Sequence, residues 1–362
     1  MRIVMTTDCV GGVWSYSMEL CRALSRYGCD IHLACLGGDA GDARRAEAAA
    51  LRNVTLHESS LRLEWMEEPW EDVGRTSEWL RSLLRDTRAD LLHLNCFGPG
   101  MYRYDVPVLL VAHSCVHSWW RAARGGDPDE SWARYRECVI GALCRADCVI
   151  APTRASLAAT ADCYEEVNLQ GRAHVILNGV EAAPWIGDRE PGAPVVLAVG
   201  RVWDEAKNLG RLVSVAPSLP CPVTIAGAGT LPADATNVVP LGALPRARLA
   251  RLYRRASVFA HPARYEPFGL AVLEAALCGC PLVLADIPPL RELWHAAARF
   301  VEPDDEEGWR RALGDVLGDP DLRRRLARAA RDRARYYSAA RMAAGYVARY
   351  RQLLALEAED VA

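Results

Sequence analysis

Two glutamates that are eight positions apart, Glu266 and Glu274, form the pair in this sequence that is most suggestive of chemistry. They lie in Tyr-Glu-Pro-Phe-Gly-Leu-Ala-Val-Leu-Glu, residues 265–274, whose proline and Gly269 mark a tight turn. On a helix that begins near Leu270, Glu274 falls beside the apolar stripe rather than opposite it. A carboxylate there is costly to desolvate unless a donor meets it, so we interpret Glu274 as an acceptor for ligand hydroxyls, such as a ribose diol. A stripe-edge glutamate that reaches water is the structural alternative.

The start of the same helix is a candidate anion site. The amides of Phe268, Gly269 and Leu270 are expected to lack acceptors there, and Glu266 precedes them on the loop. Unpaired amides at a helix start favour bound anions. One glutamate is therefore expected beside an anion site, with the second deeper along the helix.

A second cluster, Val-Gly-Arg-Val-Trp-Asp-Glu-Ala-Lys-Asn-Leu at residues 199–209, contains two cations after an apolar run. Lys207 is the only lysine among 43 basic residues, which favours a position that needs a compact point charge. The fork of Arg201 and the ammonium of Lys207 together suit a diphosphate. In the alternative, both side chains are solvated and one pairs with Asp204 or Glu205.

Short apolar runs that alternate with amphipathic segments predict parallel sheets in an α/β fold. In the first half we expect strands at residues 2–6, 31–36, 90–94, 108–112, 148–151 and 174–177, and helices at 14–27, 75–87, 130–145 and 153–164. Residues 181–194, rich in proline and glycine, predict a linker. Beyond it we expect strands at 195–199, 223–226, 237–240, 257–260, 282–285 and 299–301, and helices at 208–216, 246–255, 270–277, 290–297, 305–335 and 338–357.

Length and composition narrow the class of protein. The 362 residues favour two domains, and 51% hydrophobic with 25% charged residues excludes a disordered or disulfide-stapled chain. A net charge of -3 without basic blocks predicts no nucleic-acid partner. The thirteen cysteines show no metal or redox spacing, and no leader or membrane-spanning run is visible, so we expect a cytoplasmic protein. Peripheral membrane contact stays open.

Aromatic residues and histidines of the first half are weaker candidates. His113 follows an expected strand, and its loop is expected to continue through His117, Trp119 and Trp120. If exposed, these rings and Trp14 would form a stacking surface for an acceptor, whereas buried aromatics would only fill the core. Two Asp-Pro-Asp triplets precede helices, where aspartate caps, so we expect no essential metal.

Taken together, these motifs resemble the retaining, nucleotide-sugar-dependent glycosyltransferases of the GT-B fold, family 4 (glycosyl transferases group 1). The sequence has Gly-Arg-x5-Lys-Asn, then Glu-x7-Glu within Glu-Pro-Phe-Gly-Leu-x-x-Leu-Glu-Ala, and shorter motifs at 11–13, 112–114, 178–180 and 226–229. The resemblance covers nearly the whole chain. It implies two Rossmann-like domains facing across a cleft: an acceptor-binding domain over 1–183 plus 338–362, to which the last helix crosses back, and a donor-binding domain over 184–337.

The resemblance also implies roles for individual residues. Arg201 and Lys207 would hold the donor diphosphate, Glu274 the ribose, and Glu266 would lie near the donor sugar. The remaining donor contacts are expected from the Phe268, Gly269 and Leu270 amides, from Gly12 beside the phosphate, from His113 on the sugar, and from the backbone of Leu241 and Gly242 at the base. The expected catalytic set is His113, Arg201, Lys207 and Glu266.

The sequence therefore predicts transfer of a hexose from a nucleoside diphosphate sugar to an acceptor hydroxyl, by a metal-independent front-face reaction that retains configuration and needs no cofactor beyond this co-substrate. The base, the sugar and the acceptor stay undetermined; the acceptor could be a sugar, a small molecule or a lipid-linked glycan. Two alternatives bind the same donor: a GT-B epimerase or hydrolase that needs no acceptor, and a non-catalytic nucleotide-sugar binding protein.

Overall fold

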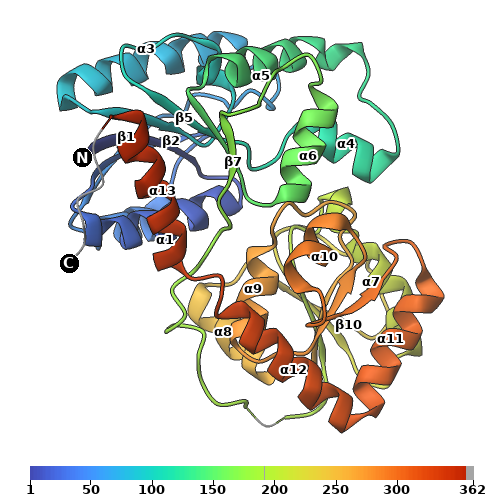
Figure 1. The fold of residues 1–362 in the computed structure, drawn as a ribbon. Helices are drawn as coiled ribbons and strands as arrows, with labels where there is room; N and C mark the ends of the chain where they lie inside the picture. The colour runs from blue at the N-terminus through green and yellow to red at the C-terminus, as the bar shows by residue number, and fades with distance from the viewer. Residues whose placement is uncertain (191, 356–362) are drawn as a thin grey trace. The chain divides into compact units, whose positions relative to one another are not determined.

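A computed structural model describes residues 1–190 and 192–355, which form two compact units (Figure 1). The first unit contains residues 1–121, 126–179 and 339 onward, and the second contains 122–125 and 180–338. The end of the expected N-terminal domain, residues 356–362, lies outside the described residues.

The first unit is built on a seven-stranded parallel sheet in the order β3-β2-β1-β4-β5-β6-β7. Its strands are β1 Arg2–Asp8, β2 Asp30–Leu36, β3 Val54–Glu58, β4 Leu91–Leu94, β5 Val108–Val111, β6 Cys148–Ala151 and β7 Ala173–Val175. The inner strands β4, β5 and β6 are buried along their whole length. Burial on both faces explains why their sequences are apolar without alternation.

Helices cover this sheet, and the last helix of the chain is one of them. They are α1 Gly12–Leu24, α2 Gly41–Ala49, α3 Trp70–Thr87, α4 Val116–Arg124, α5 Ala133–Arg145, α6 Arg154–Cys163 and α13 Ala339–Leu353. Helix α13 lies beside α1 (Figure 1), where the ring of Tyr346 meets that of Tyr16 at 6.2 Å. The expectation that the C-terminal helix returns to the N-terminal domain is confirmed.

The structure corrects the expectation of a loop that carries His117, Trp119 and Trp120. These residues lie on α4, which begins at Val116. The thiol of Cys115 accepts a hydrogen bond from the Ser118 amide at 3.3 Å, so a cysteine takes the place of the usual N-cap residue. Because this cap is unusual, the sequence carries no ordinary helix-start signal here.

The second unit is built on a six-stranded parallel sheet in the order β10-β9-β8-β11-β12-β13. Its strands are β8 Val196–Val199, β9 Val223–Ala226, β10 Val238–Gly242, β11 Val258–His261, β12 Leu282–Ala285 and β13 Arg299–Val301. Its helices are α7 Leu209–Val215, α8 Arg246–Arg255, α9 Leu270–Leu277, α10 Pro288–Trp294, α11 Glu306–Gly318 and α12 Pro320–Ala334. Each unit is thus the Rossmann-like α/β layer structure that the sequence predicts.

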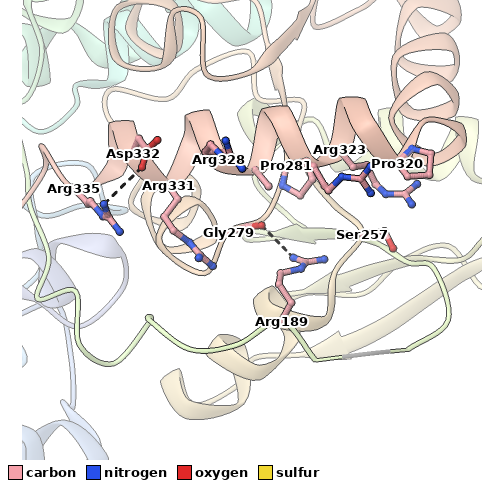
Figure 2. A pocket seen from close by; sticks show the side chains of 12 residues that line it. Arg189, Ser257, Gly279, Pro281, Pro320, Arg323, Arg328, Arg331, Asp332 and Arg335 are labelled. Atoms are coloured by element: carbon pink, nitrogen blue, oxygen red, sulfur yellow. Dashed lines mark hydrogen bonds and ion pairs between the residues drawn. The ribbon is translucent and has the colours of Figure 1, made fainter.

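The segment expected to be a linker is anchored to the second unit. Trp185 is fully buried, and its ring meets that of Tyr253 at 6.0 Å. Arg189 donates hydrogen bonds to the backbone carbonyls of Ala256 and Gly279, the latter at 3.3 Å (Figure 2). The buried ring of Trp185 and the guanidinium of Arg189 therefore hold this segment against the second unit. Its proline and glycine content had indicated only a linker.

Candidate functional site

The loop after β8 carries both cations that the sequence singled out. Arg201 donates through Nη2 to Asp204 at 2.7 Å, while its Nε is buried and meets no acceptor among the described residues. The ring of Trp203 lies 5.1 Å from the same guanidinium. Of the alternatives left open, the pairing with Asp204 is therefore realised by Arg201, whose buried Nε is left without an acceptor.

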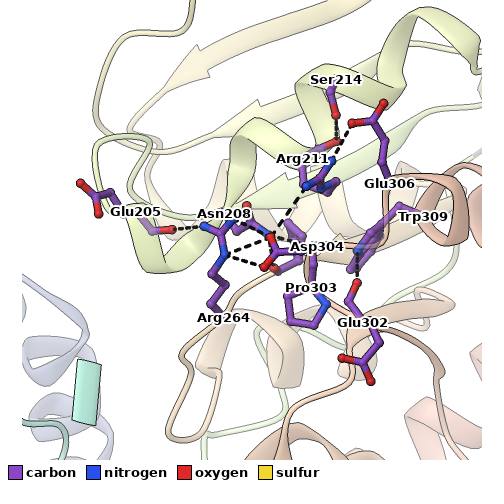
Figure 3. A network of polar contacts seen from close by, with 11 residues as sticks. Glu205, Asn208, Arg211, Ser214, Arg264, Glu302, Pro303, Asp304, Glu306 and Trp309 are labelled. Atoms are coloured by element: carbon purple, nitrogen blue, oxygen red, sulfur yellow. Dashed lines mark hydrogen bonds and ion pairs between the residues drawn. The ribbon is translucent and has the colours of Figure 1, made fainter. Parts of the chain in front are cut away.

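A polar network holds the far side of this loop in place (Figure 3). Asn208, with a left-handed φ of 51°, donates to the backbone carbonyl of Pro303 at 2.9 Å. Arg264 donates to the backbone carbonyl of Glu205 at 3.4 Å and pairs with Asp304 at 3.1 Å. Because the residues on both sides of Lys207 are tied to other loops of the unit, the origin of the lysine side chain is fixed.

Lys207, Glu266 and His261 form a compact buried cluster. The Glu266 Oε2 atom accepts hydrogen bonds from Lys207 Nζ at 2.7 Å and from His261 Nε2 at 3.0 Å. Burial alone would raise the pKa of the Glu266 carboxyl, but the Lys207 ammonium and the His261 hydrogen bond hold that pKa well below its ordinary value. Glu266 is therefore an ionised carboxylate in a largely buried position.

The other oxygen of Glu266 and the start of α9 present free hydrogen-bonding capacity. In the described part of the chain, Oε1 of Glu266 accepts no hydrogen bond, and no acceptor outside the helix meets the amides of Phe268, Gly269 and Leu270. Gly269 has a left-handed φ of 87°, which turns the chain into the helix at a conformation that glycine tolerates. The Phe268 ring is buried against Tyr337, so the ring itself is not free to contact a ligand. A carboxylate oxygen that can accept a hydrogen bond from a hydroxyl thus lies beside backbone amides that can donate to an anion.

Glu274 is half-buried on α9, as its place beside the apolar stripe predicts. Its Oε2 accepts a hydrogen bond from the Tyr253 hydroxyl of α8 at 3.3 Å. The structure therefore shows a carboxylate held by a neighbouring helix, and its role toward a ribose stays a prediction.

Two glycines, Gly200 directly after β8 and Gly227 directly after β9, allow a close approach of two backbone segments. A Cβ added at Gly227, whose φ is +154°, would lie 1.7 Å from the Gly200 carbonyl oxygen. The Gly227 amide donates to the carbonyl of Gly242 at 2.8 Å, which ties the end of β10 to the same place. Leu241 and Gly242 therefore border the loop that carries Arg201, and their role at a base stays a prediction.

In the first unit, His113 belongs to a chain of hydrogen bonds. The partners in this chain determine the tautomers of His113 and of a second histidine, His93. The Asn95 amide donates to the Thr6 carbonyl at 2.7 Å, so Asn95 Oδ1 faces Nε2 of His113 at 2.8 Å and Nε2 of His93 at 3.2 Å. Both histidines must donate to that oxygen, and His93 Nδ1 then accepts from the Tyr350 hydroxyl at 2.6 Å.

Burial lowers the pKa of both His93 and His113 to about 3, so both rings are neutral at pH 7. With Nε2 protonated, Nδ1 of His113 carries a lone pair and meets no partner among the described residues. His113 is therefore a fixed, neutral hydrogen-bond acceptor at the carboxyl end of β5.

The remaining first-unit candidates differ in exposure. Trp14 is buried and donates to Glu47 at 2.8 Å, and His117 is buried with its ring 6.1 Å from that of Tyr135. Neither ring belongs to an exposed stacking surface. Trp119 and Trp120 are half-buried on α4, and their acceptor role stays a prediction.

Gly12 begins α1 directly after the loop that follows β1. A Cβ added there would meet no atom within 4 Å, so the fold itself does not require glycine. If glycine is needed at this position, the need arises from a bound group.

Sequence reasoning missed two residues that complete these arrangements, His261 and Asn95. Each ends or follows a buried strand, β11 and β4 respectively, at the carboxyl edge of its sheet. The rule that singled out His113 could have found both, because polar residues that interrupt apolar strands gather at this edge.

Across residues 1–190 and 192–355, no three His, Cys, Asp or Glu side chains are grouped to hold a metal ion. The same part of the chain contains no helix with the length and apolar content needed to cross a membrane. The capping prediction for the Asp-Pro-Asp triplets is confirmed: Asp129 accepts from the Ser131 amide at 3.0 Å, and Asp319 accepts from the Leu322 amide at 2.9 Å.

Solved structures with the same fold include several enzymes. Sucrose-phosphate synthase from Thermosynechococcus elongatus superposes with a TM-score of 0.82 at 20% identity, covering 98% of this chain and 99% of that one. The Anabaena protein HepE, solved in complex with UDP-glucose, gives 0.75 at 16% identity, covering 97% and 100%. At such identities the likeness shows the fold, which is the GT-B fold.

Sequence comparison points to the same group of enzymes. Glycogen synthase of Mycobacterium tuberculosis is 38% identical over 182 residues, which cover 44% of this chain and only 43% of that protein. D-inositol 3-phosphate glycosyltransferase of Xylanimonas cellulosilytica is 28% identical over 381 residues, covering 91% and 89%. Two family models match adjacent parts of the chain, "Glycosyltransferase Family 4" at residues 10–183 and "Glycosyl transferases group 1" at residues 181–333. With its fold and both halves of its sequence in agreement, the chain belongs to the group 1 glycosyltransferases of family 4.

Proposed function

We propose that this glycosyltransferase moves a hexose from a nucleoside diphosphate sugar to an acceptor hydroxyl with retention of configuration. The observation that carries the proposal is the Lys207–Glu266–His261 cluster beside the unpaired amides at the start of α9. A cation and amide donors suit a diphosphate, and an ionised carboxylate with a free oxygen suits sugar hydroxyls. The complex of HepE with UDP-glucose supports a hexosyl nucleotide as donor, and the name of the glycosyltransferase from Xylanimonas cellulosilytica supports glycosyl transfer.

The second unit would bind this donor. Arg201 and Lys207 would contact the diphosphate together with the amides of Phe268, Gly269 and Leu270. Glu266 would accept from a sugar hydroxyl through Oε1, since Oε2 is already occupied by two donors. Glu274 would accept from the ribose, and the backbone of Leu241 and Gly242 would border the base.

The first unit would contribute to the sugar and would bind the acceptor. Nδ1 of His113 would accept from a hydroxyl of the donor sugar, because its tautomer leaves a lone pair there. Gly12 would leave room for the phosphate. Trp119 and Trp120 are the aromatic candidates for the acceptor, whose class we leave open among sugars, small molecules and lipid-linked glycans. Trp14 and His117 are buried and would therefore not contact the acceptor directly.

The reaction would take place on one face of the sugar. The bond from the anomeric carbon to the diphosphate breaks as the bond to the acceptor oxygen forms, and the departing diphosphate oxygen takes the acceptor proton. Arg201, Lys207 and the α9 amides would stabilise the charge that grows on the diphosphate, which is the main catalytic contribution in this scheme. No metal would be required, and the reaction would occur in the cytoplasm.

Incubation of the protein with a sugar nucleotide and an acceptor panel, with and without EDTA, tests this proposal. We expect consumption that depends on acceptor, is unchanged by EDTA, and yields a product whose anomeric proton coupling by NMR matches that of the donor. Turnover without acceptor would instead identify an epimerase or hydrolase, and binding without turnover would identify a non-catalytic binding protein. An inverted product or loss with EDTA would refute retention or metal independence.

A further inference from the structure

A pocket of about 590 Å³, whose lining residues Figure 2 shows, lies in the second unit near the amino-terminal ends of strands of the sheet. It is lined by α12 and by residues that precede strands: Ser257 comes just before β11 and Pro281 just before β12. Lys207 and Glu266 instead follow the carboxyl ends of β8 and β11. Because the strands are parallel, the pocket lies at their amino-terminal ends, whereas Lys207 and Glu266 lie at their carboxyl ends. The pocket is therefore separate from the proposed donor site.

The lining of the pocket is strongly cationic. It contains six arginines and a single carboxylate, that of Asp332; the arginines are Arg189, Arg323, Arg324, Arg328, Arg331 and Arg335. Four of them, at positions 324, 328, 331 and 335, recur at spacings of four, three and four residues along α12 and its end. This spacing places them along one face of the helix, where like charges destabilise one another in the absence of an anion.

Part of this charge is used by the fold, and part is uncompensated. Arg189 and Arg331 donate to backbone carbonyls, of Gly279 at 3.3 Å and of Cys278 at 3.4 Å. Arg335 lies 3.7 Å from Asp332, with both side chains about two-thirds exposed. Arg328 is exposed, and within the described residues it forms neither a hydrogen bond nor an ion pair. Arg323 also donates to a backbone carbonyl, that of Val316 at 3.2 Å, and Arg324 pairs with Asp321. Three guanidinium groups are thus held by backbone carbonyls and two pair with carboxylates, which leaves Arg328 with donors to spare.

We propose that this pocket binds a phosphorylated small molecule with at least two negative charges, such as a sugar phosphate or a short inorganic polyphosphate. The planar donor forks of arginine match the geometry of phosphate oxygens better than a point charge does. The volume falls within the range of roughly 300–1,000 Å³ typical of small-molecule sites. A hollow suits such a compact ligand, whereas a membrane surface would be met by a convex face. This site is independent of the proposed donor site.

Calorimetric titration of the full chain with inorganic pyrophosphate and, separately, with glucose 6-phosphate tests the proposal. The experiments are run in the Lys207→Ala background and repeated with wild type saturated with UDP, so that the donor site does not contribute. We expect millimolar or tighter binding of at least one probe, weakened about tenfold or more by Arg328→Glu. The matched control is Arg325→Glu, an exposed arginine of the same helix that does not line the pocket.

Each outcome decides the matter. A tighter response to glucose 6-phosphate than to pyrophosphate would assign the site to a sugar phosphate, and the reverse order would assign it to an inorganic polyphosphate. No binding of either probe at 10 mM, a concentration chosen to exceed weak physiological affinities, would overturn the proposal, as would equal weakening by both substitutions. Flotation with anionic vesicles that is lost in Arg328→Glu, without binding of soluble phosphates, would replace the pocket ligand with a membrane surface. Failure of donor binding in wild type would leave these titrations unaffected.

Discussion

Lys207 is the single lysine of the chain, and its ammonium forms an ion pair with a carboxylate that is itself largely buried. The side-chain exposures are 17% for Lys207 and 13% for Glu266, so neither charge is fully screened by water. A cation already desolvated and fixed beside an unpaired row of amides needs little reorganisation to meet a diphosphate. This arrangement is why we assign Lys207 to transition-state stabilisation rather than to the protein surface.

Replacement of Lys207 by alanine should therefore impair transfer. We expect kcat/KM to fall by about 30- to 1000-fold, equivalent to about 2–4 kcal/mol of transition-state stabilisation, because the charge that grows on the diphosphate loses its cation. Initial rates with the identified donor measure the effect, and Arg325→Ala on α12 serves as a control. A loss smaller than threefold would contradict the diphosphate role of Lys207.

Two neutral histidines, the buried His93 and the partly buried His113, make the stability of the protein depend on pH. His93 and His113 have pKa values of about 3 in the folded chain, against about 6.5 when unfolded. Below pH 6.5 the unfolded state binds more protons, so stability falls as pH falls toward 3, and the lowered pKa of Glu266 acts with the same sign below about pH 4.5.

Urea unfolding between pH 7 and pH 5 should show this dependence as a loss of about 1 kcal/mol or more. His93→Gln should flatten the curve, while His295→Gln, at an exposed position, should not. A free energy of unfolding that stays level over this interval would show that neither ring is held neutral by burial.

Residue patterns singled out Lys207 and Glu266 but not the contacts that these side chains make. Lys207 stood out because it is the only lysine, and Glu266 because of the motif that contains it. Both signals are present in the sequence alone. Their contact joins residues 59 positions apart, and the choice of Asp204 over Glu205 as partner of Arg201 depends on the turn that Asp204 caps. Such pairings follow from tertiary geometry, which single-sequence patterns do not contain.

At the scale of elements, buried strands were the most predictable feature because their sequences are apolar throughout. The buried strands at residues 148–151, 223–226 and 282–285 match the expected bounds. The strand at 299–301 also matches, although Arg299 is exposed. Strand β3 was not expected, since it forms the edge of its sheet and is only partly buried. Helix α2 was also missed, because its alanines and charges form no wide apolar stripe.

The close approach of the loop after β9 to the loop after β8 gives a prediction at this scale. Gly227→Ala would place a methyl group 1.7 Å from the Gly200 carbonyl oxygen, so the loop that carries Arg201 must move. We expect nucleotide affinity to fall about tenfold or more and stability to fall by about 1–3 kcal/mol. Calorimetry and urea unfolding measure the two effects.

Gly210→Ala is the matched control, because a Cβ at that position in α7 meets no atom within 4 Å. Helix propensity predicts that this change is neutral or stabilising by up to about 1 kcal/mol. If Gly227→Ala behaved like Gly210→Ala, the close approach of the two loops would not matter for binding.

At the scale of the whole molecule, the sequence indicated two α/β domains and the return of the last helix to the first. What it did not indicate is how the connection is fixed: Trp185 is a fully buried ring within a stretch whose composition resembles a loose linker. Composition averages over a window and therefore hides one large side chain that fills a core. The cationic pocket beside α12 is a feature of the same kind, since it forms only when the fold brings Arg189 next to the arginines of that helix.

The central claim is that the second unit binds a nucleoside diphosphate sugar through Lys207 and its neighbours. A thermal-shift panel of UDP, GDP, ADP and TDP sugars without added metal, on wild type and Lys207→Ala, tests it most directly. A ligand at 100 times its dissociation constant adds about 2.7 kcal/mol of stability. We predict a clear rise in Tm with one nucleotide in wild type and a much smaller rise in Lys207→Ala. No rise with any donor, or an equal rise in both proteins, would contradict the account.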